Sequence, residues 1–257
     1  VKLANDLSDE DRIFLLANDS DSVTRWDSLQ TIATNVVLGF YKNRPAEGLG
    51  SIELPAPFVE AFRSVLSNKS LDKKFVAQVL TLPLESELIE NVTDADPVAI
   101  HECRKAVILG LATSLKDLFL SVYKECTVDE EYKPTIEAMA RRALRIAALG
   151  FLANLNTPET RALCMEAYQS ATNMTEQMGA LGCVAMNSGE EREQSLESFY
   201  QQWKEDPLVL ISWLRVQATS EAPGNVERVK KLMEHPAFDI KNPNKCYATI
   251  RAFPWSC

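Results

Sequence analysis

The chain has 257 residues, 46% of them hydrophobic and 25% charged, which is typical of folded globular proteins and argues against a disordered chain. Its formal net charge of -9 argues against nucleic acid as a partner, because a phosphate backbone needs clustered Lys and Arg. No apolar run reaches the roughly 20 residues of a membrane helix, so we expect no membrane insertion. The length fits one large domain or one repeat array.

The cysteines indicate the redox environment. Their spacing matches neither a zinc site nor a dense disulfide framework: Cys103, Cys126, Cys164, Cys183, Cys246 and Cys257. Four of the six fall inside predicted helices, where a free cysteine behaves as a small apolar side chain. We therefore expect reduced thiols and a cytoplasmic location. Asn-x-Ser/Thr triplets leave a secreted or organellar location open; they begin at Asn18, Asn68, Asn91 and Asn173.

Short amphipathic helices with clear start signals fill the first half of the chain. One helix begins at Ser8, and a longer one is predicted over about residues 22–42. A loop rich in proline and glycine follows near 44–57. Helices are then predicted over 57–66 and 71–82, the second with Ser70 as its N-cap. Asp96-Pro97 opens a long helical stretch to about Cys126.

The second half continues in the same way. Pro134 opens a helix that is apolar over more than a third of its surface, which predicts a central position. Further helix starts are indicated by Thr157-Pro158, capping boxes at Asn173/Glu176 and Ser188/Glu191, Asp206-Pro207, Pro223-Gly224-Asn225 and Asn242-Pro243. No stretch shows the period-two alternation of a strand.

These elements predict an all-α fold of about a dozen short helices. Antiparallel pairs recurring at about 35–45 residues are typical of a HEAT- or armadillo-like α-solenoid. We expect a single helical-repeat domain over residues 1–257, with a compact irregular helical bundle as the alternative.

The sequence offers little catalytic chemistry. Of the two histidines, His101 has Lys105 four residues later and His235 is distant, so the helical zinc motif with His at i and i+4 is absent. There is no Gly-x-Ser-x-Gly elbow and no phosphate-binding glycine loop. Acidic pairs stand at helix starts, where the helix dipole accounts for them. We predict no catalytic residue and no metal ligand.

Two clusters are candidates for binding. Arg141, Arg142 and Arg145 form one basic cluster, and an anion contact in a groove is weighed against ordinary surface pairing with Glu137. Aromatic residues at helical spacing indicate helix-helix core more than a stacking surface; they are Tyr200, Trp203 and Trp213.

Several longer motifs occur in a fixed order along nearly the whole chain. They include Arg25-Trp26-Asp27, Ala140-Arg141-Arg142-Ala143-Leu144, the stretch from Phe199 through Trp213 to Ser220, His235-Pro236-Ala237-Phe238-Asp239 and Asn242-Pro243-Asn244-Lys245. Over about residues 1–250 the sequence resembles the C-terminal helical domain of the aminopeptidase N (alanyl aminopeptidase) family of zinc metallopeptidases, in its bacterial and plant-type branch.

The resemblance carries expectations about function. In the family, the zinc ligands and catalytic residues lie in an upstream domain, so it implies no cofactor on this chain and no peptidase activity from it alone. The C-terminal domain covers the active site and gates peptide access. Asn242, Asn244, Lys245 and Tyr247 match its channel-side segment. The tail, 251–257, diverges from the family pattern.

The partner depends on which of several hypotheses holds. As part of an enzyme, the chain would contact the upstream catalytic domain. As a free-standing truncated paralogue, it would bind a peptide, a protein or a small molecule, form a homo-oligomer, or carry a new activity in a repurposed pocket. The acidic balance favours basic peptides as ligands.

Overall fold

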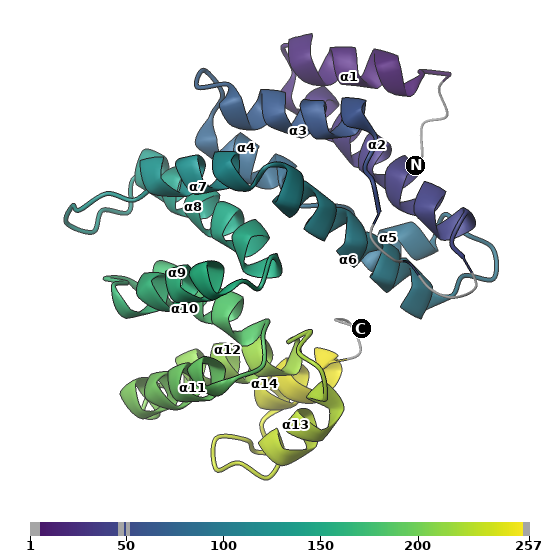
Figure 1. Cartoon of the computed structure of the whole chain (residues 1–257). Coiled ribbons are helices and arrows are strands. Elements are labelled where there is room, and N and C mark those ends of the chain that lie inside the picture. The colour runs from purple at the N-terminus through teal and green to yellow at the C-terminus, as the bar shows by residue number, and fades with distance from the viewer. Residues whose placement is uncertain (1–5, 46–48, 50–51, 254–257) are drawn as a thin grey trace. The chain divides into compact units, whose positions relative to one another are not determined.

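The computed structural model describes residues 6–45, 49 and 52–253, and every regular element among them is helical (Figure 1). The prediction of an all-α fold is confirmed. Contacts between helices divide the chain into two compact units, Val1–Leu155 and Asn156–Cys257, which are described separately below. The prediction of a single repeat domain over 1–257 therefore stays a prediction. Residues 254–257 of the divergent tail lie outside the described part.

The first unit contains eight helices within the described residues. They are α1 (Asp9–Asn18), α2 (Ser22–Lys42), α3 (Ala56–Ser67), α4 (Lys73–Val79), α5 (Glu85–Ile89), α6 (Pro97–Ser114), α7 (Lys116–Glu125) and α8 (Ile136–Asn154). The closest packing joins α1 to α2, α4 to α8 and α7 to α8. Stacked rings of Phe119 and Phe151, with centroids 4.5 Å apart, hold α7 on α8. Apolar faces are thus buried both between helices consecutive in the chain, such as α7 and α8, and between helices far apart in it, such as α4 and α8.

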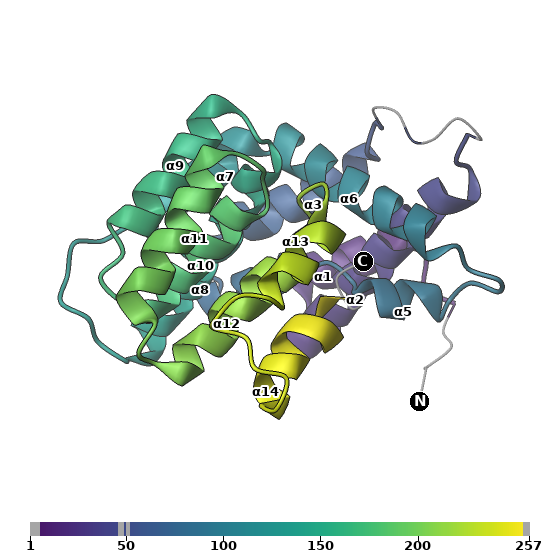
Figure 2. The same ribbon diagram turned by 90° about the horizontal axis from the view of Figure 1, so that it is seen from below.

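The second unit contains α9 (Pro158–Gln169), α10 (Met174–Ala185), α11 (Glu190–Trp203), α12 (Pro207–Ala218), α13 (Asn225–Leu232), α14 (Pro243–Cys246) and a π-helix, Tyr247–Arg251. Each of α9 to α12 packs on the next helix along the chain, and the π-helix packs on α12, α13 and α14 (Figure 2). Phe199, Trp213 and Leu214 are buried in its core.

Most of the expected start signals act as caps. The helix predicted over 22–42 has these bounds, with the Asp21 carboxylate accepting from two backbone N–H groups. Four further predicted helix starts, each with a proline at the first helical position, are confirmed by side-chain caps from Asp96, Thr157, Asp206 and Asn242.

Two predicted caps are wrong. Asp72, not Ser70, caps α4, because its carboxylate accepts from the N–H of Phe75 while Ser70 bonds to Asn68. The capping box predicted at Ser188 does not form, since Gly189 is the N-cap of α11 and has a positive φ of 140°. The Ser188 hydroxyl instead accepts from Arg228.

Three other predictions need correction. The long helix expected from 97 to about 126 is two helices, α6 and α7, that meet at Leu115 with a bend of 75°. The next helix begins at Ile136 with Thr135 as its cap, not at Pro134. The Asn173 side chain caps α10 as expected, by accepting from the N–H of Glu176. The return hydrogen bond to the Glu176 carboxylate comes from the Asn173 side-chain amide rather than from its backbone N–H, as it would in a capping box.

Within the described residues, no single helix is long and apolar enough to cross a membrane. Only α6 and α7 together, as a bent pair, reach the necessary length and composition.

Candidate functional site

A groove of about 390 Å³ lies between α11, α12 and α13 in the unit Asn156–Cys257. We call it the three-helix groove, and its lining includes Arg192, Leu196, Trp213, Gln217, Arg228 and His235. Arg192 and Arg228 lie at the end near the start of α11, and aromatic groups lie farther along the same helices, where the Glu197 carboxylate acts on the pKa of His235. The groove therefore joins an end with two guanidinium groups to an end built from aromatic rings.

Arg192 is the most deeply buried charged group of the groove, with its side chain only 2% exposed. Its Nε donates to the carbonyl of Ala185 at 3.3 Å, and its Nη1 donates to the exposed carboxylate of Glu193 at 2.7 Å. Its Nη2 is buried and has no hydrogen-bond acceptor among the described residues. A buried donor without an acceptor is uncommon, since most buried polar groups are paired.

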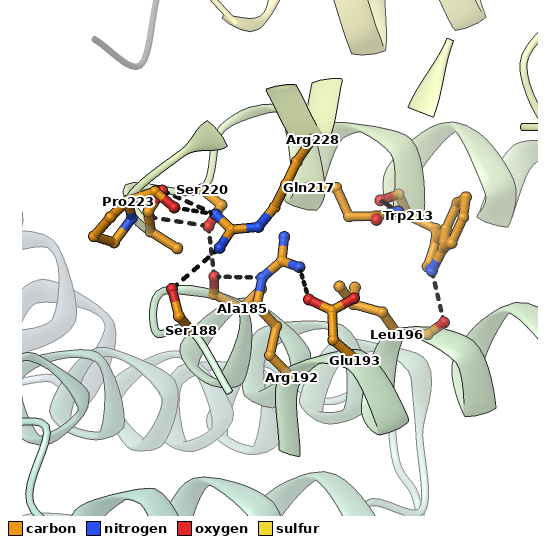
Figure 3. Close-up of polar contacts among 11 residues, drawn as sticks. Ala185, Ser188, Arg192, Glu193, Leu196, Trp213, Gln217, Ser220, Pro223 and Arg228 are labelled. Carbon is orange, nitrogen blue, oxygen red and sulfur yellow. Dashed lines mark hydrogen bonds and ion pairs between the residues drawn. The ribbon is translucent and has the colours of Figure 1, made fainter. Parts of the chain in front are cut away.

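Arg228 lies at the same end of the groove (Figure 3). Its Nη1 donates to the carbonyls of Ala222 (3.1 Å) and Pro223 (2.6 Å), and its Nη2 donates to the Ser188 hydroxyl at 3.2 Å. The left-handed Gly224, with φ of 79°, forms the turn that brings these carbonyls beside the start of α13. The turn thus fixes the position of the Arg228 guanidinium.

The same end contains a second network around the carbonyl of Ala185 (Figure 3). The carbonyl of Ala185 accepts from Arg192 and also from the buried Ser220 hydroxyl, at 2.5 Å. The Ser220 hydroxyl accepts in turn from the N–H of Ala222. This network ties the end of α10 to the loop before α13.

The apolar end is built from aromatic rings. The Trp213 indole donates to the carbonyl of Leu196 at 2.9 Å, which fixes α12 on α11. The rings of Tyr200 and His235 lie 5.2 and 5.1 Å from the Trp213 ring. His235 Nδ1 accepts from the N–H of Ala237, and burial lowers the pKa of this imidazole against the smaller opposing effect of the Glu197 carboxylate.

This arrangement suits a ligand with one anionic group and one apolar group. Guanidinium groups bind carboxylates with two parallel hydrogen bonds, and the rings offer an apolar contact a short distance away. No group of three or more His, Cys, Asp or Glu residues in the described part of the chain is arranged to hold a metal ion.

The predicted arginine cluster lies on α8 of the first unit. Arg141 pairs with Glu130, while Arg142 is buried over the Tyr132 ring and donates to the carbonyl of Lys133. Arg145 lies over the Tyr123 ring and donates to its hydroxyl. Each of the three guanidinium groups thus has a protein contact. Their predicted role in anion binding stays a prediction.

The predicted channel-side residues lie at α14 in the second unit. The Asn242 side chain caps this helix by accepting from the N–H groups of Asn244 and Lys245. Tyr247 is half exposed at the start of the π-helix and, together with Arg215 and Arg251, lines a separate groove of about 450 Å³. Asn244 and Tyr247 are accessible, while Asn242 has a capping role. Contact with a substrate stays a prediction for this segment.

The sequence did not single out Arg192 or Arg228. Arg192 follows a serine and two glutamates that match a capping box, and Arg228 follows a turn motif, so both look like surface residues of helix starts. The turn Pro223-Gly224-Asn225 was the one signal that could have located the second arginine. Trp213 is buried, as its helical spacing predicted.

Helices that pack in chain order, as α9 to α13 do here, are typical of helical-repeat proteins. A family model described as a domain of unknown function (DUF3458_C) with ARM repeats matches residues 9–256, so the chain belongs to this family, and the predicted α-solenoid is confirmed.

Curated relatives extend the match. The chain is 34% identical over 257 residues to aminopeptidase N of Escherichia coli (strain K12), covering all of this chain and 29% of that protein. It is 32% identical over 253 residues to aminopeptidase N of Caulobacter vibrioides, covering 98% of this chain and 29% of that protein. The chain thus spans about 29% of the length of these relatives.

A solved structure is similar to this chain over nearly its whole length. Legionella pneumophila aminopeptidase A in complex with aspartic acid matches with a TM-score of 0.84 and 28% identity, covering 98% of this chain and 30% of that one. The predicted resemblance to the C-terminal domain of aminopeptidase N is thereby confirmed.

Proposed function

We propose that this chain serves as the helical C-terminal region of an aminopeptidase N-like enzyme and limits the access of peptides to a zinc site held elsewhere in that enzyme. The observation that carries the proposal is the match along the whole chain to 29% of the length of the E. coli enzyme. A rigid stack of helices can exclude bulky substrates by shape, without supplying a catalytic group.

The groove around Tyr247 supports a contact with substrate. The Tyr247 ring is 53% exposed, and the Arg251 guanidinium lies over it at 5.4 Å. Asn244 is exposed on the preceding turn. We propose that Asn244, Lys245 and Tyr247 lie beside the path of the peptide. A cytoplasmic location is part of this proposal, supported by the buried cysteines in helices, such as Cys103 and Cys164.

Kinetics on the full protein that carries this chain test the gating role. With Tyr247→Ala, we expect kcat/KM for long peptides to rise severalfold relative to kcat/KM for a single aminoacyl p-nitroanilide, because removal of the Tyr247 ring widens the path. The control is Leu208→Ala, which removes an exposed apolar side chain on α12, outside the groove around Tyr247. An unchanged ratio for Tyr247→Ala, or an equal change for Leu208→Ala, contradicts the gating role.

A second candidate function is that of a free-standing protein that binds a ligand. The three-helix groove favours it, because its lining lies wholly within the unit Asn156–Cys257 and includes an unpaired buried guanidinium nitrogen. Intact mass spectrometry of the protein from its source distinguishes the two. A mass close to that of these 257 residues favours this candidate.

A further inference from the structure

We propose that the three-helix groove is a binding site for a carboxylate that carries a neighbouring apolar group, with Arg192 and Arg228 holding the carboxylate. The proposal concerns this chain's own residues and does not depend on the peptidase function proposed above. The ligand class covers the C-terminal carboxylate of a short peptide and a small free carboxylic acid, which share this chemistry.

The first support is the unpaired Nη2 of Arg192. The other two nitrogens of this guanidinium have acceptors, the Ala185 carbonyl and the Glu193 carboxylate. A buried charge normally has its hydrogen-bonding groups satisfied, because leaving one unpaired is costly. The unpaired Nη2 nitrogen points toward Arg228 (Figure 3), which lines the same groove as Arg192. An oxygen atom of a ligand would complete this set.

The second support is the charge of the side chains that line the groove. Arg228 and Lys231 line the same groove and bring the number of cationic side chains to three with Arg192. The facing acidic groups are Glu193 and Glu197, so the cations are in excess although the chain as a whole has a net charge of -9. An anion is therefore favoured at this place and disfavoured over most of the surface.

The third support is that a ligand carboxylate can take the place of one hydrogen-bond partner of Arg228. Arg228 Nη2 donates to the Ser188 hydroxyl, a neutral partner that a charged carboxylate can replace with a stronger hydrogen bond. A carboxylate that replaces Ser188 as the acceptor of Arg228 Nη2 leaves the two Nη1 hydrogen bonds, to the carbonyls of Ala222 and Pro223, in place. One carboxylate can then accept from both guanidinium groups, in the planar geometry that arginine prefers.

The fourth support is the apolar end. Leu196 and Trp213 line the groove, next to the His235 ring. The volume of about 390 Å³ falls in the range of small-molecule sites, roughly 300–1,000 Å³. A phenyl or branched aliphatic group beside the carboxylate fits this end. Plain phosphate would use the arginines but leave this surface uncovered.

NMR titration of the 257-residue chain tests the proposal. The indole N–H signal of Trp213, assigned with Trp213→Phe, reports on the groove, and the indoles of Trp26 and Trp203 serve as internal references. We expect N-acetylphenylalanine to shift the Trp213 signal saturably, with Kd on the order of 1 mM for a ligand of this size. Its carboxamide analogue should bind at least tenfold more weakly. Inorganic phosphate should not match the carboxylate.

The source of the ligand is resolved by a third probe, acetyl-Ala-Ala-Phe with a free carboxylate. Tighter binding of this tripeptide than of N-acetylphenylalanine supports a peptide terminus, and equal or weaker binding supports a small free acid. Equal shifts from the carboxylate and its carboxamide overturn the proposal. So does the absence of any saturable shift, or phosphate binding as tight as that of N-acetylphenylalanine.

Variants locate the site. We expect Arg192→Met and Arg228→Met each to weaken binding of N-acetylphenylalanine at least tenfold. Arg228→Lys keeps the charge but loses the paired donors, and should also weaken binding, which covers the case in which Arg228→Met fails to fold. The control is Lys230→Met on the same helix, where an exposed lysine pairs with Glu227 outside the groove. A loss for Lys230→Met as large as for Arg228→Lys contradicts the assignment.

Discussion

Replacing Arg192 with methionine should leave the protein as stable as before or make it more stable, although a buried residue is changed. The Arg192 side chain is 2% exposed, and methionine retains much of its apolar stem. The substitution removes one long hydrogen bond to the Ala185 carbonyl and one pairing with the exposed Glu193, together worth about 1–2 kcal/mol. It also removes the cost of the unpaired Nη2, about 1–3 kcal/mol.

The Arg192→Met substitution leaves no other buried polar group without a hydrogen-bond partner. The Ala185 carbonyl keeps its hydrogen bond from the Ser220 hydroxyl, and the Glu193 carboxylate returns to water. We therefore expect a change in the free energy of unfolding between about 0 and 1 kcal/mol in favour of the folded state. In a chain of this size that is a rise in Tm of up to about 4 °C.

Thermal and urea unfolding of Arg192→Met and of Ser220→Ala form the assay. Ser220→Ala removes a donor to the same carbonyl, but it also leaves the N–H of Ala222 without its acceptor, so we expect a loss of about 1–3 kcal/mol. A loss above about 2 kcal/mol for Arg192→Met would contradict this expectation, because it would mean that the Arg192 guanidinium stabilises the fold.

Three further changes test other parts of the account. Phe119→Ala should cost about 3–5 kcal/mol in urea unfolding, because its fully buried ring stacks on α8, and a cost below about 1 kcal/mol would contradict the packing. Burial lowers the pKa of His235, so the unfolded chain binds that proton first: stability should be full above pH 6.5 and fall as the pH drops below it. In His235→Asn, whose amide can still accept from the N–H of Ala237, this part of the pH dependence should vanish, and its persistence would assign it to another group. Asp206→Ala should lower the free energy of unfolding by about 1 kcal/mol, because it removes the cap of α12, whereas Ser188→Ala should change it by less than about 0.5 kcal/mol. A larger loss for Ser188→Ala than for Asp206→Ala would support the capping box predicted at Ser188.

Local signals in the sequence predicted the helices well where a cap and an apolar stripe agree. Ser22–Lys42 has both, and its bounds are as expected. The break at Leu115 had no such signal, because leucine favours helix and the apolar pattern continues through it. The bend follows from tertiary contacts: α6 also packs on α2 and α5, α7 also packs on α3, and both contact α8. Local chemistry therefore locates most helix starts, while tertiary contacts decide where a long apolar stretch is divided.

Local sequence signals could not predict the candidate site. Arg192 and Arg228 are 36 positions apart and come together only because α11 and α13 both pack on α12. Whether an arginine is buried, and whether its nitrogens find acceptors, depends on those contacts rather than on its neighbours in sequence. The recognisable basic cluster, Arg141 with its neighbours, instead lies over tyrosine rings and against Glu130.

The proposed role as the access-limiting region of a larger zinc peptidase is tested most directly by the intact mass and zinc content of the protein isolated from its source. Because 257 residues correspond to 29% of the E. coli relative, we expect a mass several times that of this chain, with stoichiometric zinc and hydrolysis of aminoacyl substrates. A mass matching these 257 residues, without zinc or hydrolysis, would contradict it.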